Sequence, residues 1–138
     1  MDYSNAISGI NWLGVIVAAL STLFVGGLWY SPLIFGKKWM TSNGFSEEDL
    51  KKGSAIKVLG GTFILAFFAA FSLAMFIGPN SNPSFAATAG FMVGFFWIAA
   101  AFGIVYLFEK RSFKHFMINA GYFIVSFTIM GLILGIWK

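Results

Sequence analysis

Four long stretches without a charged side chain constrain this chain more than any other feature. They cover Tyr3–Gly36, Val58–Phe76, Ser84–Phe108 and Phe116–Trp137. A helix needs about 20 residues to cross the hydrocarbon layer of a bilayer, and each stretch is long enough. Only 10% of the residues are charged, against about 25% in soluble domains. The sequence therefore predicts one all-α membrane domain over residues 1–138, a four-helix transmembrane bundle with helices at about 11–31, 57–78, 84–108 and 116–137.

The basic residues are concentrated in two of the connecting loops. Five lysines lie between the first two stretches, and two lysines and an arginine lie between the last two. The loop at 78–83 is uncharged, and the C-terminus offers only Lys138. Because basic loops stay on the cytoplasmic side, we expect both termini outside (N-out/C-out). The N-terminus has Asp2 and no basic residue before position 37, so we expect a retained helix instead of a cleaved signal.

Pro32 interrupts the first stretch near its cytoplasmic end. Proline lacks an N–H and clashes with the preceding turn, so the helix must end or kink near Ser31. We favour an end here, with a kinked helix that continues to Gly36 as the alternative. The cytoplasmic loop at 37–56 follows, and Ser46 with Asp49 forms a capping-box pattern that predicts a short helix from about Glu47. This loop is either a solvated connector or a surface that docks a partner.

Small residues recur at every fourth position in the predicted helices. Because little hydrophobic force drives helices together in lipid, such positions are typical of contact faces where backbones approach closely. The pattern leaves open whether these contacts form within one chain or between chains. The residues are Gly14, Ala18, Thr22 and Gly26 in the first helix, Thr62, Ala66, Ala70, Ala74 and Gly78 in the second, Ala86, Gly90 and Gly94 in the third with Ala99 and Gly103 on another face, and Gly131 and Gly135 in the fourth.

The few polar side chains within the spans suggest one candidate site. Asn119 and Tyr122 are three residues apart, so they share a face near the cytoplasmic end of the fourth helix. The Trp-Tyr-Ser sequence before Pro32 reaches the same depth. The candidate ligand-binding residues are Trp29, Tyr30, Ser31, Asn119 and Tyr122. The alternative is that these groups only form hydrogen bonds between helices, each worth about 0.6–2 kcal/mol.

The sequence contains no recognisable catalytic or metal-binding cluster. It has no cysteine and one histidine, His115, which we interpret as a side chain at the membrane interface. Glu109 lies beside Lys110 and Arg111 and is expected to form an exposed ion pair. We therefore expect no enzyme activity, no metal and no cofactor. Nucleic acid is not an expected partner either, because membrane topology explains the basic residues.

Several motifs resemble those of a known family. They are N-W-L-G-V-I-V-A-A-L from Asn11, L-W-Y-S-P-L-I-F-G-K-K-W-M from Leu28, S-E-E-D-L-K-K-G from Ser46, and I-N-A-G-Y followed by I-M-G-L-I-L-G-I-W near the C-terminus. Together they closely resemble the DUF1761 family of small bacterial membrane proteins. The resemblance implies a four-helix, multi-pass protein of the bacterial cytoplasmic (inner) membrane, and it transfers no catalytic residue. The family-pattern positions are Trp29, Tyr30, Ser31, Pro32, Phe35, Gly36, Asn119 and Tyr122.

Three functional hypotheses follow. The first is a non-enzymatic homo-oligomer that binds membrane lipid or a small ligand at the cytoplasmic side of the bundle. The second is a passive channel or transporter along an oligomer axis lined by one set of small residues. The third is a membrane scaffold whose loop at 37–57 docks a cytoplasmic partner. Proton-coupled export is disfavoured, because no carboxylate lies within a predicted span.

Overall fold

The computed structural model describes residues 3–137, so Met1, Asp2 and Lys138 lie outside the described residues. Four helices are long and apolar enough to cross a membrane, which confirms the all-α four-helix prediction: Trp12–Trp29, Ala55–Ile77, Pro83–Glu109 and Phe113–Ile136. The elements are α1 Tyr3–Ser8, α2 Trp12–Trp29, α3 Gly36–Asn43, α4 Glu47–Lys51, α5 Ala55–Ile77, α6 Pro83–Met92, the π-helical turn η1 Val93–Ile98, α7 Ala99–Glu109 and α8 Phe113–Ile136.

Each spanning helix begins at a residue whose side chain caps the first turn. The side-chain oxygens of Asn11, Ser54, Asn82 and Ser112 accept hydrogen bonds from backbone N–H groups three residues later. Pro83 follows its cap at the first helical position, where no N–H is needed. These caps satisfy N–H groups that a helix cannot pair internally, so they fix where each span starts.

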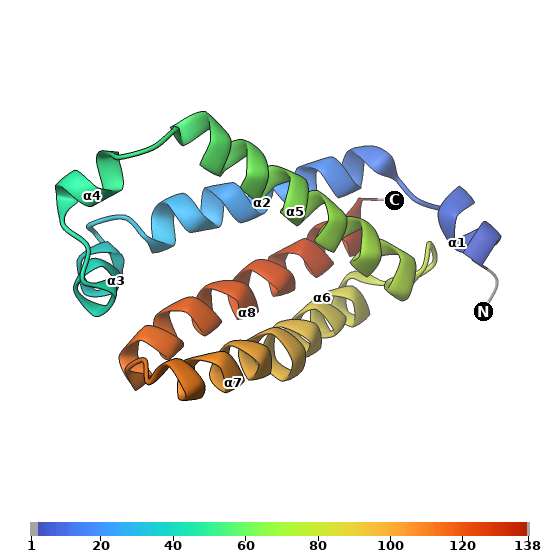
Figure 1. Ribbon diagram of the computed structural model, residues 1–138. Helices are drawn as coiled ribbons and strands as arrows, with labels where there is room; N and C mark the ends of the chain where they lie inside the picture. Colours follow the sequence, from blue (N-terminus) through green and yellow to red (C-terminus); the bar gives the residue numbers. More distant parts are fainter. Residues whose placement is uncertain (1–2, 138) are drawn as a thin grey trace.

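The helix α8 is the centre of the bundle. It contacts α2 on one side and α6, η1 and α7 on the other, while α5 lies against α2 (Figure 1). Among the described residues α8 supplies eleven buried positions, against six from α2 and four from α5. Helix α1 and the C-terminal end of α8 lie at one end of the bundle, here called the terminal end (Figure 1). Helices α3 and α4 and the turn between α7 and α8 lie at the opposite end, here called the loop end (Figure 1).

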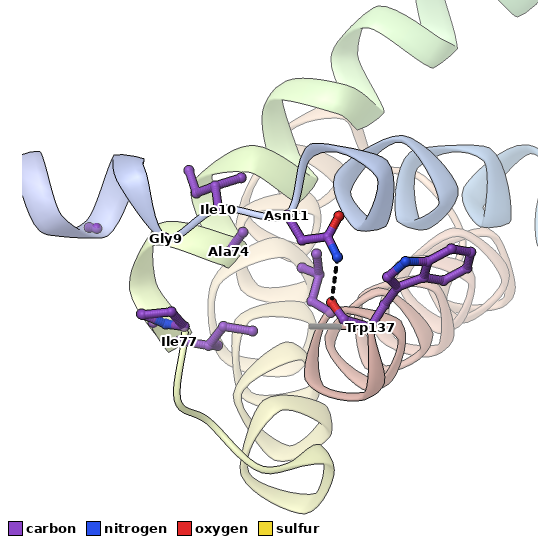
Figure 2. A pocket seen from close by; sticks show the side chains of 10 residues that line it. Gly9, Ile10, Asn11, Ala74, Ile77 and Trp137 are labelled. Atoms are coloured by element: carbon purple, nitrogen blue, oxygen red, sulfur yellow. Dashed lines mark hydrogen bonds between the residues drawn. The ribbon is translucent and has the colours of Figure 1, made fainter.

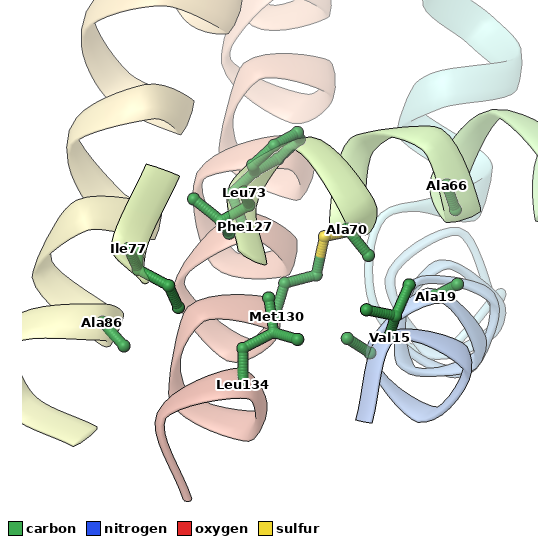
Figure 3. Close-up of a cluster of buried hydrophobic side chains, with 11 residues drawn as sticks. Val15, Ala19, Ala66, Ala70, Leu73, Ile77, Ala86, Phe127, Met130 and Leu134 are labelled. Atoms are coloured by element: carbon green, nitrogen blue, oxygen red, sulfur yellow. The ribbon is translucent and has the colours of Figure 1, made fainter. Parts of the chain in front are cut away.

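An apolar core joins α2, α5, α6 and α8 (Figure 3). Met130 of α8 is almost fully buried at its centre, and Val15 of α2 is fully buried. The cluster consists of Val15, Ala18, Ala19, Ala66, Ala70, Leu73, Ile77, Ala86, Phe127, Met130 and Leu134. Small alanines of α2 and α5 face this core, so these two helices pack closely without large side chains between them.

Helices α6 and α8 approach each other most closely. A Cβ atom added to Gly131 would meet the Ala86 carbonyl, and one added to Gly90 would meet the Phe127 carbonyl. Gly135 is equally confined, because its added Cβ would lie 2.7 Å from the Ala86 Cβ. Backbone therefore packs on backbone here, which only glycine allows. These glycines form contacts within one chain, and this answers the question that the sequence pattern left open.

The π-helical turn η1 changes the register of the third span. A π turn takes one more residue than an α turn, so the five-residue step from Gly94 to Ala99 replaces the usual four. Beyond it, Ala99 is buried and an added Cβ on Gly103 would lie 3.3 Å from Phe116 Cε2 of α8. The expectation that Ala99 and Gly103 lie on another face is therefore wrong, because the extra residue rotates both toward α8.

Between α2 and α5 the chain forms two short helices. The first, α3, was not expected, and Gly44 ends it in the left-handed conformation with φ of 71°. The second, α4, begins at the expected residue, and Ser46 and Asp49 form the expected capping box. The Ser46 backbone N–H donates to the Asp49 carboxylate at 2.9 Å and, with the Ser46 hydroxyl, lowers the pKa of that carboxyl. Asp49 also forms an exposed ion pair with Lys52.

Candidate functional site

The Trp-Tyr-Ser-Pro segment is a compact turn that ends α2 and starts α3. The helix stops at Trp29, so the chain breaks at Pro32 instead of continuing as a kinked helix. The Ser31 carbonyl accepts hydrogen bonds from the N–H groups of Ile34 and Gly36, and the Trp29 carbonyl accepts one from Phe35. Gly36 is buried against this turn, where an added Cβ would lie 2.8 Å from the Ser31 carbonyl carbon.

This turn directs two aromatic side chains at the end of α2, those of Trp29 and its C-cap Tyr30, toward α8. The Trp29 indole Nε1–H donates to the Ile118 carbonyl at 2.9 Å, and the Tyr30 hydroxyl donates to Asn119 Oδ1 at 2.7 Å. The Phe35 ring packs against Trp29, with 4.8 Å between ring centroids. The Trp39 ring of α3 packs edge-on against Tyr30 at 5.3 Å. These hydrogen bonds and ring contacts thus hold the loop end of α2 against α8.

Asn119 is the centre of a hydrogen-bonded polar cluster. Its Oδ1 accepts from Tyr30, while its Nδ2 donates to the Tyr106 hydroxyl at 3.0 Å and lies 3.2 Å from His115 Nε2. These partners come from three different parts of the chain: the end of α2, α7 and the first turn of α8. One amide side chain therefore connects three segments of the bundle.

His115 is the member of this cluster that the sequence did not reveal. Only 3% of it is exposed, so the expectation of an interfacial side chain is wrong. The reason is that α3 folds over the start of α8 and brings Ser42 Oγ to 2.9 Å from His115 Nδ1. Ser42 in turn donates to the Trp39 carbonyl. With the proton on Nδ1, His115 donates to Ser42 and accepts from Asn119, so a neutral imidazole fits all of these hydrogen bonds.

Tyr122 lies one turn further along α8 and contacts α2 instead. Its hydroxyl donates to the Thr22 carbonyl at 2.8 Å, and its ring packs edge-on against Tyr30. The ring fills the space beside Gly26, where an added Cβ would lie 3.1 Å from the Tyr122 hydroxyl oxygen. The side-chain hydroxyls of Thr22 and Ser126 nearby are buried and have no hydrogen-bond partner among the described residues. Small residues of α2 thus make room for the polar face of α8.

The structure brings together four of the five candidate residues and leaves one aside. Trp29, Tyr30, Asn119 and Tyr122 meet between α2 and α8, whereas the Ser31 hydroxyl donates only to the Leu28 carbonyl in its own turn. The sequence missed three further members, which are Ser42, Tyr106 and His115. A signal for His115 was available: positions 115, 119, 122 and 126 follow the spacing of one helix face. Their binding role stays a prediction, since their polar atoms bond to each other or to backbone.

Two hollows lie elsewhere on the molecule. The first, at the terminal end between α1, the α1–α2 connection, α5 and α8, has a volume of about 140 Å³. Figure 2 shows Asn11 and Trp137 at its rim, where Asn11 Nδ2 donates to the Trp137 carbonyl at 3.4 Å. This volume is below the roughly 300–1,000 Å³ of typical ligand pockets, so the hollow suits a few water molecules.

The second hollow, here called the α7–α8 groove, has a volume of about 360 Å³. Its lining includes buried Ala99 and Ala120 and half-exposed Phe95 and Met117. Its lining is almost entirely apolar, and it consists of Phe95, Ala99, Ala100, Gly103, Phe116, Met117, Ala120, Gly121 and Ile124. The groove exists because small residues follow the π turn on α7 and face small residues on α8.

The turn that joins α7 to α8 at the loop end contains several charged residues. Lys110 adopts a left-handed conformation with φ of 58° after the last turn of α7. The Arg111 Nε lies 3.5 Å from the Glu109 carboxylate, which is the exposed ion pair that the sequence predicted. Lys114 follows in the first turn of α8 and is exposed. Within residues 3–137 no group of three His, Cys, Asp or Glu side chains could hold a metal ion.

The four apolar spans around an apolar core define a multi-pass helical membrane protein. The family model of DUF1761, described as a protein of unknown function, matches residues 13–135, so the chain belongs to this family. No curated protein and no solved structure matches the chain.

Proposed function

We propose that this protein is a non-enzymatic membrane protein that binds lipid, with an acyl chain in the α7–α8 groove. The groove is the observation that supports this proposal. It is apolar, large enough for a ligand and open on a side that faces the hydrocarbon layer if the four helices span a membrane. The predicted site around Asn119 has its polar atoms paired within the chain, whereas the groove one helix face away has room for an occupant.

Filling the groove tests this function. Gly103→Phe places a ring where an added Cβ already lies 3.3 Å from Phe116, and Ala100→Phe fills the groove from its exposed edge. Gly27→Phe is the matched control, because nothing lies within 4 Å of a Cβ added to Gly27. The protein is extracted in mild detergent, and native mass spectrometry measures the fraction of molecules that retain phospholipid.

We expect both groove variants to lose most of the retained lipid and the control to keep it. A thermal unfolding scan shows which variants are folded. If the more confined Gly103→Phe does not fold, lipid retention by Ala100→Phe alone tests whether the groove binds lipid. Lipid retention by folded Ala100→Phe equal to that of Gly27→Phe would overturn the proposal.

The same proposal includes an orientation with both termini outside the cytoplasm of a bacterium. Its support is that eight of the nine basic residues belong to segments at the loop end of the bundle. The chain has no natural cysteine, so single cysteines report topology without background. A membrane-impermeant maleimide added to intact cells should label Asn80→Cys and not Lys51→Cys. Labelling of Lys51→Cys alone would reverse the orientation.

We further propose a homo-oligomer. Its support is an open strip on α5, where nothing lies within 4 Å of Cβ atoms added to Gly60 and Gly61. A second copy could therefore approach this helix closely. The native mass spectra described above report the subunit number directly, and a strict monomer in several mild detergents would contradict this part. A passive channel between copies has less support, because the glycines of α6 and α8 already pack within one chain.

A further inference from the structure

We infer that the α7–α8 groove selects anionic phospholipids through the basic turn at its loop end; this inference rests on the proposed lipid binding. The occupant is a phospholipid whose acyl chain lies in the groove and whose phosphate meets Lys110, Arg111 and Lys114.

Lys114 lies on the helix stripe that lines the groove. Residues three and seven positions apart share a face of an α-helix, and Lys114 precedes the lining residues Met117 and Gly121 by three and seven positions. At 1.5 Å per residue its Cα is about 4.5 Å beyond that of Met117, toward the loop end. Its long side chain can therefore keep its ammonium group at the headgroup level while its carbon atoms border the groove.

The turn before α8 adds two further cations beside the same opening. Lys110 follows the last residue of α7 and lies seven residues after the lining residue Gly103, and Arg111 comes next. Three cations and the carboxylate of Glu109 leave this turn with a net charge of +2. The side chains of this turn are exposed, and an ion pair joins Arg111 to Glu109 at 3.5 Å. A net positive opening above an apolar groove matches a molecule with a negatively charged head and a hydrocarbon tail.

The charge of the turn predicts a measurable preference. One basic residue near an anionic surface contributes about 1 kcal/mol, which corresponds to about a fivefold change in affinity. We expect the natural protein to prefer phosphatidylglycerol over phosphatidylethanolamine with the same acyl chains by at least this factor. The preference should weaken in high salt, because exposed charges are screened.

The experiment is a competition followed by native mass spectrometry. The protein in mild detergent is mixed with equal amounts of phosphatidylglycerol and phosphatidylethanolamine, and the ratio of the two bound lipids is measured. One variant combines Lys110→Gln, Arg111→Gln and Lys114→Gln. The control combines Lys51→Gln and Lys52→Gln, which remove exposed charges at the loop end in or next to α4 instead of the groove.

We expect the triple variant to bind both lipids about equally and the control to keep the preference of the natural protein. Retention of the preference by the triple variant would overturn the inference. Binding of both lipids without preference by the natural protein would also overturn it, while leaving the proposed function intact. Loss of both lipids in Ala100→Phe, together with equal binding of both lipids by the triple variant, would support the inference. It would show that the groove is needed for binding and the basic turn for the choice of headgroup.

Discussion

Replacing Asn119 by leucine tests whether the polar cluster holds the loop end of the bundle together. The substitution removes the acceptor of the Tyr30 hydroxyl and the donor to Tyr106 and His115. Leucine is similar in volume, so the main change is the loss of three hydrogen bonds. It also leaves the half-buried Tyr30 hydroxyl and the buried His115 ring nitrogen without their Asn119 partner, which costs free energy of its own.

The expected loss can be worked out from these contacts. Hydrogen bonds between membrane helices contribute about 0.6–2 kcal/mol each, so three of them correspond to about 2–6 kcal/mol of unfolding free energy. Equilibrium unfolding in mixed micelles of rising denaturing-detergent content, followed by circular dichroism, measures this quantity. Thr128→Val is the control, because the Thr128 hydroxyl donates only to the Ile124 carbonyl of its own helix. The control should change the unfolding free energy by less than about 0.5 kcal/mol.

A double-mutant cycle with Tyr30→Phe sharpens this test. Tyr30→Phe removes one hydroxyl and keeps the ring that packs on Trp39 and Tyr122. In the natural protein it should cost about 0.6–2 kcal/mol, whereas in the Asn119→Leu background it should cost almost nothing, because the partner is already absent. Equal costs in both backgrounds, or an unchanged stability of Asn119→Leu, would refute the cluster as a stabilising network.

Other predictions follow from close packing and from the loop helix. Gly131→Leu should separate α6 from α8 and abolish cooperative unfolding, because even a Cβ atom there meets the α6 backbone. Gly36→Ala should lower the unfolding free energy by about 1–3 kcal/mol, since its Cβ would overlap the Ser31 backbone. Hydrogen bonds from Ser46 lower the pKa of the Asp49 carboxyl. Its ionised form therefore stabilises α4 fully above the ordinary carboxyl pKa of about 4, and this stabilisation is lost as the pH falls through the lowered pKa. The Ser46 amide signal in a micelle NMR titration should report this transition, and Asp49→Asn should lack it.

The sequence predicted the helical segments well, because hydropathy and the residues that cap or end a helix depend only on the local sequence. Pro32 ends a helix through its own ring, and Ser46 caps one through its own hydroxyl, so neither depends on distant contacts. The shared depth of Tyr30 and Asn119 also followed from counting residues along two helices. These predictions needed only the rise per residue and the thickness of a bilayer.

The features that the sequence did not predict all depend on which faces meet. In lipid both sides of a spanning helix are apolar, so hydropathy does not mark the inward side as it does in water. The burial of His115 depends on α3, which folds over the start of α8 from another part of the chain. The π turn at Val93–Ile98 is unmarked in the sequence, and without it the position of Gly103 beside Phe116 could not be foreseen. The groove follows from that register and was therefore missed as well.

The central place of α8 has a consequence for how the protein is made. Chains are synthesised from the N-terminus, so α2, α5 and α6–α7 enter the membrane before the helix that most of them pack against. During that interval the glycine faces of α6 stay open, and Tyr30 and Tyr106 have no amide to bond. The native bundle can therefore close only when the last span arrives. A nascent protein halted before Phe113 would therefore leave exposed the glycine face of α6 and the two tyrosine hydroxyls that α8 covers in the complete bundle.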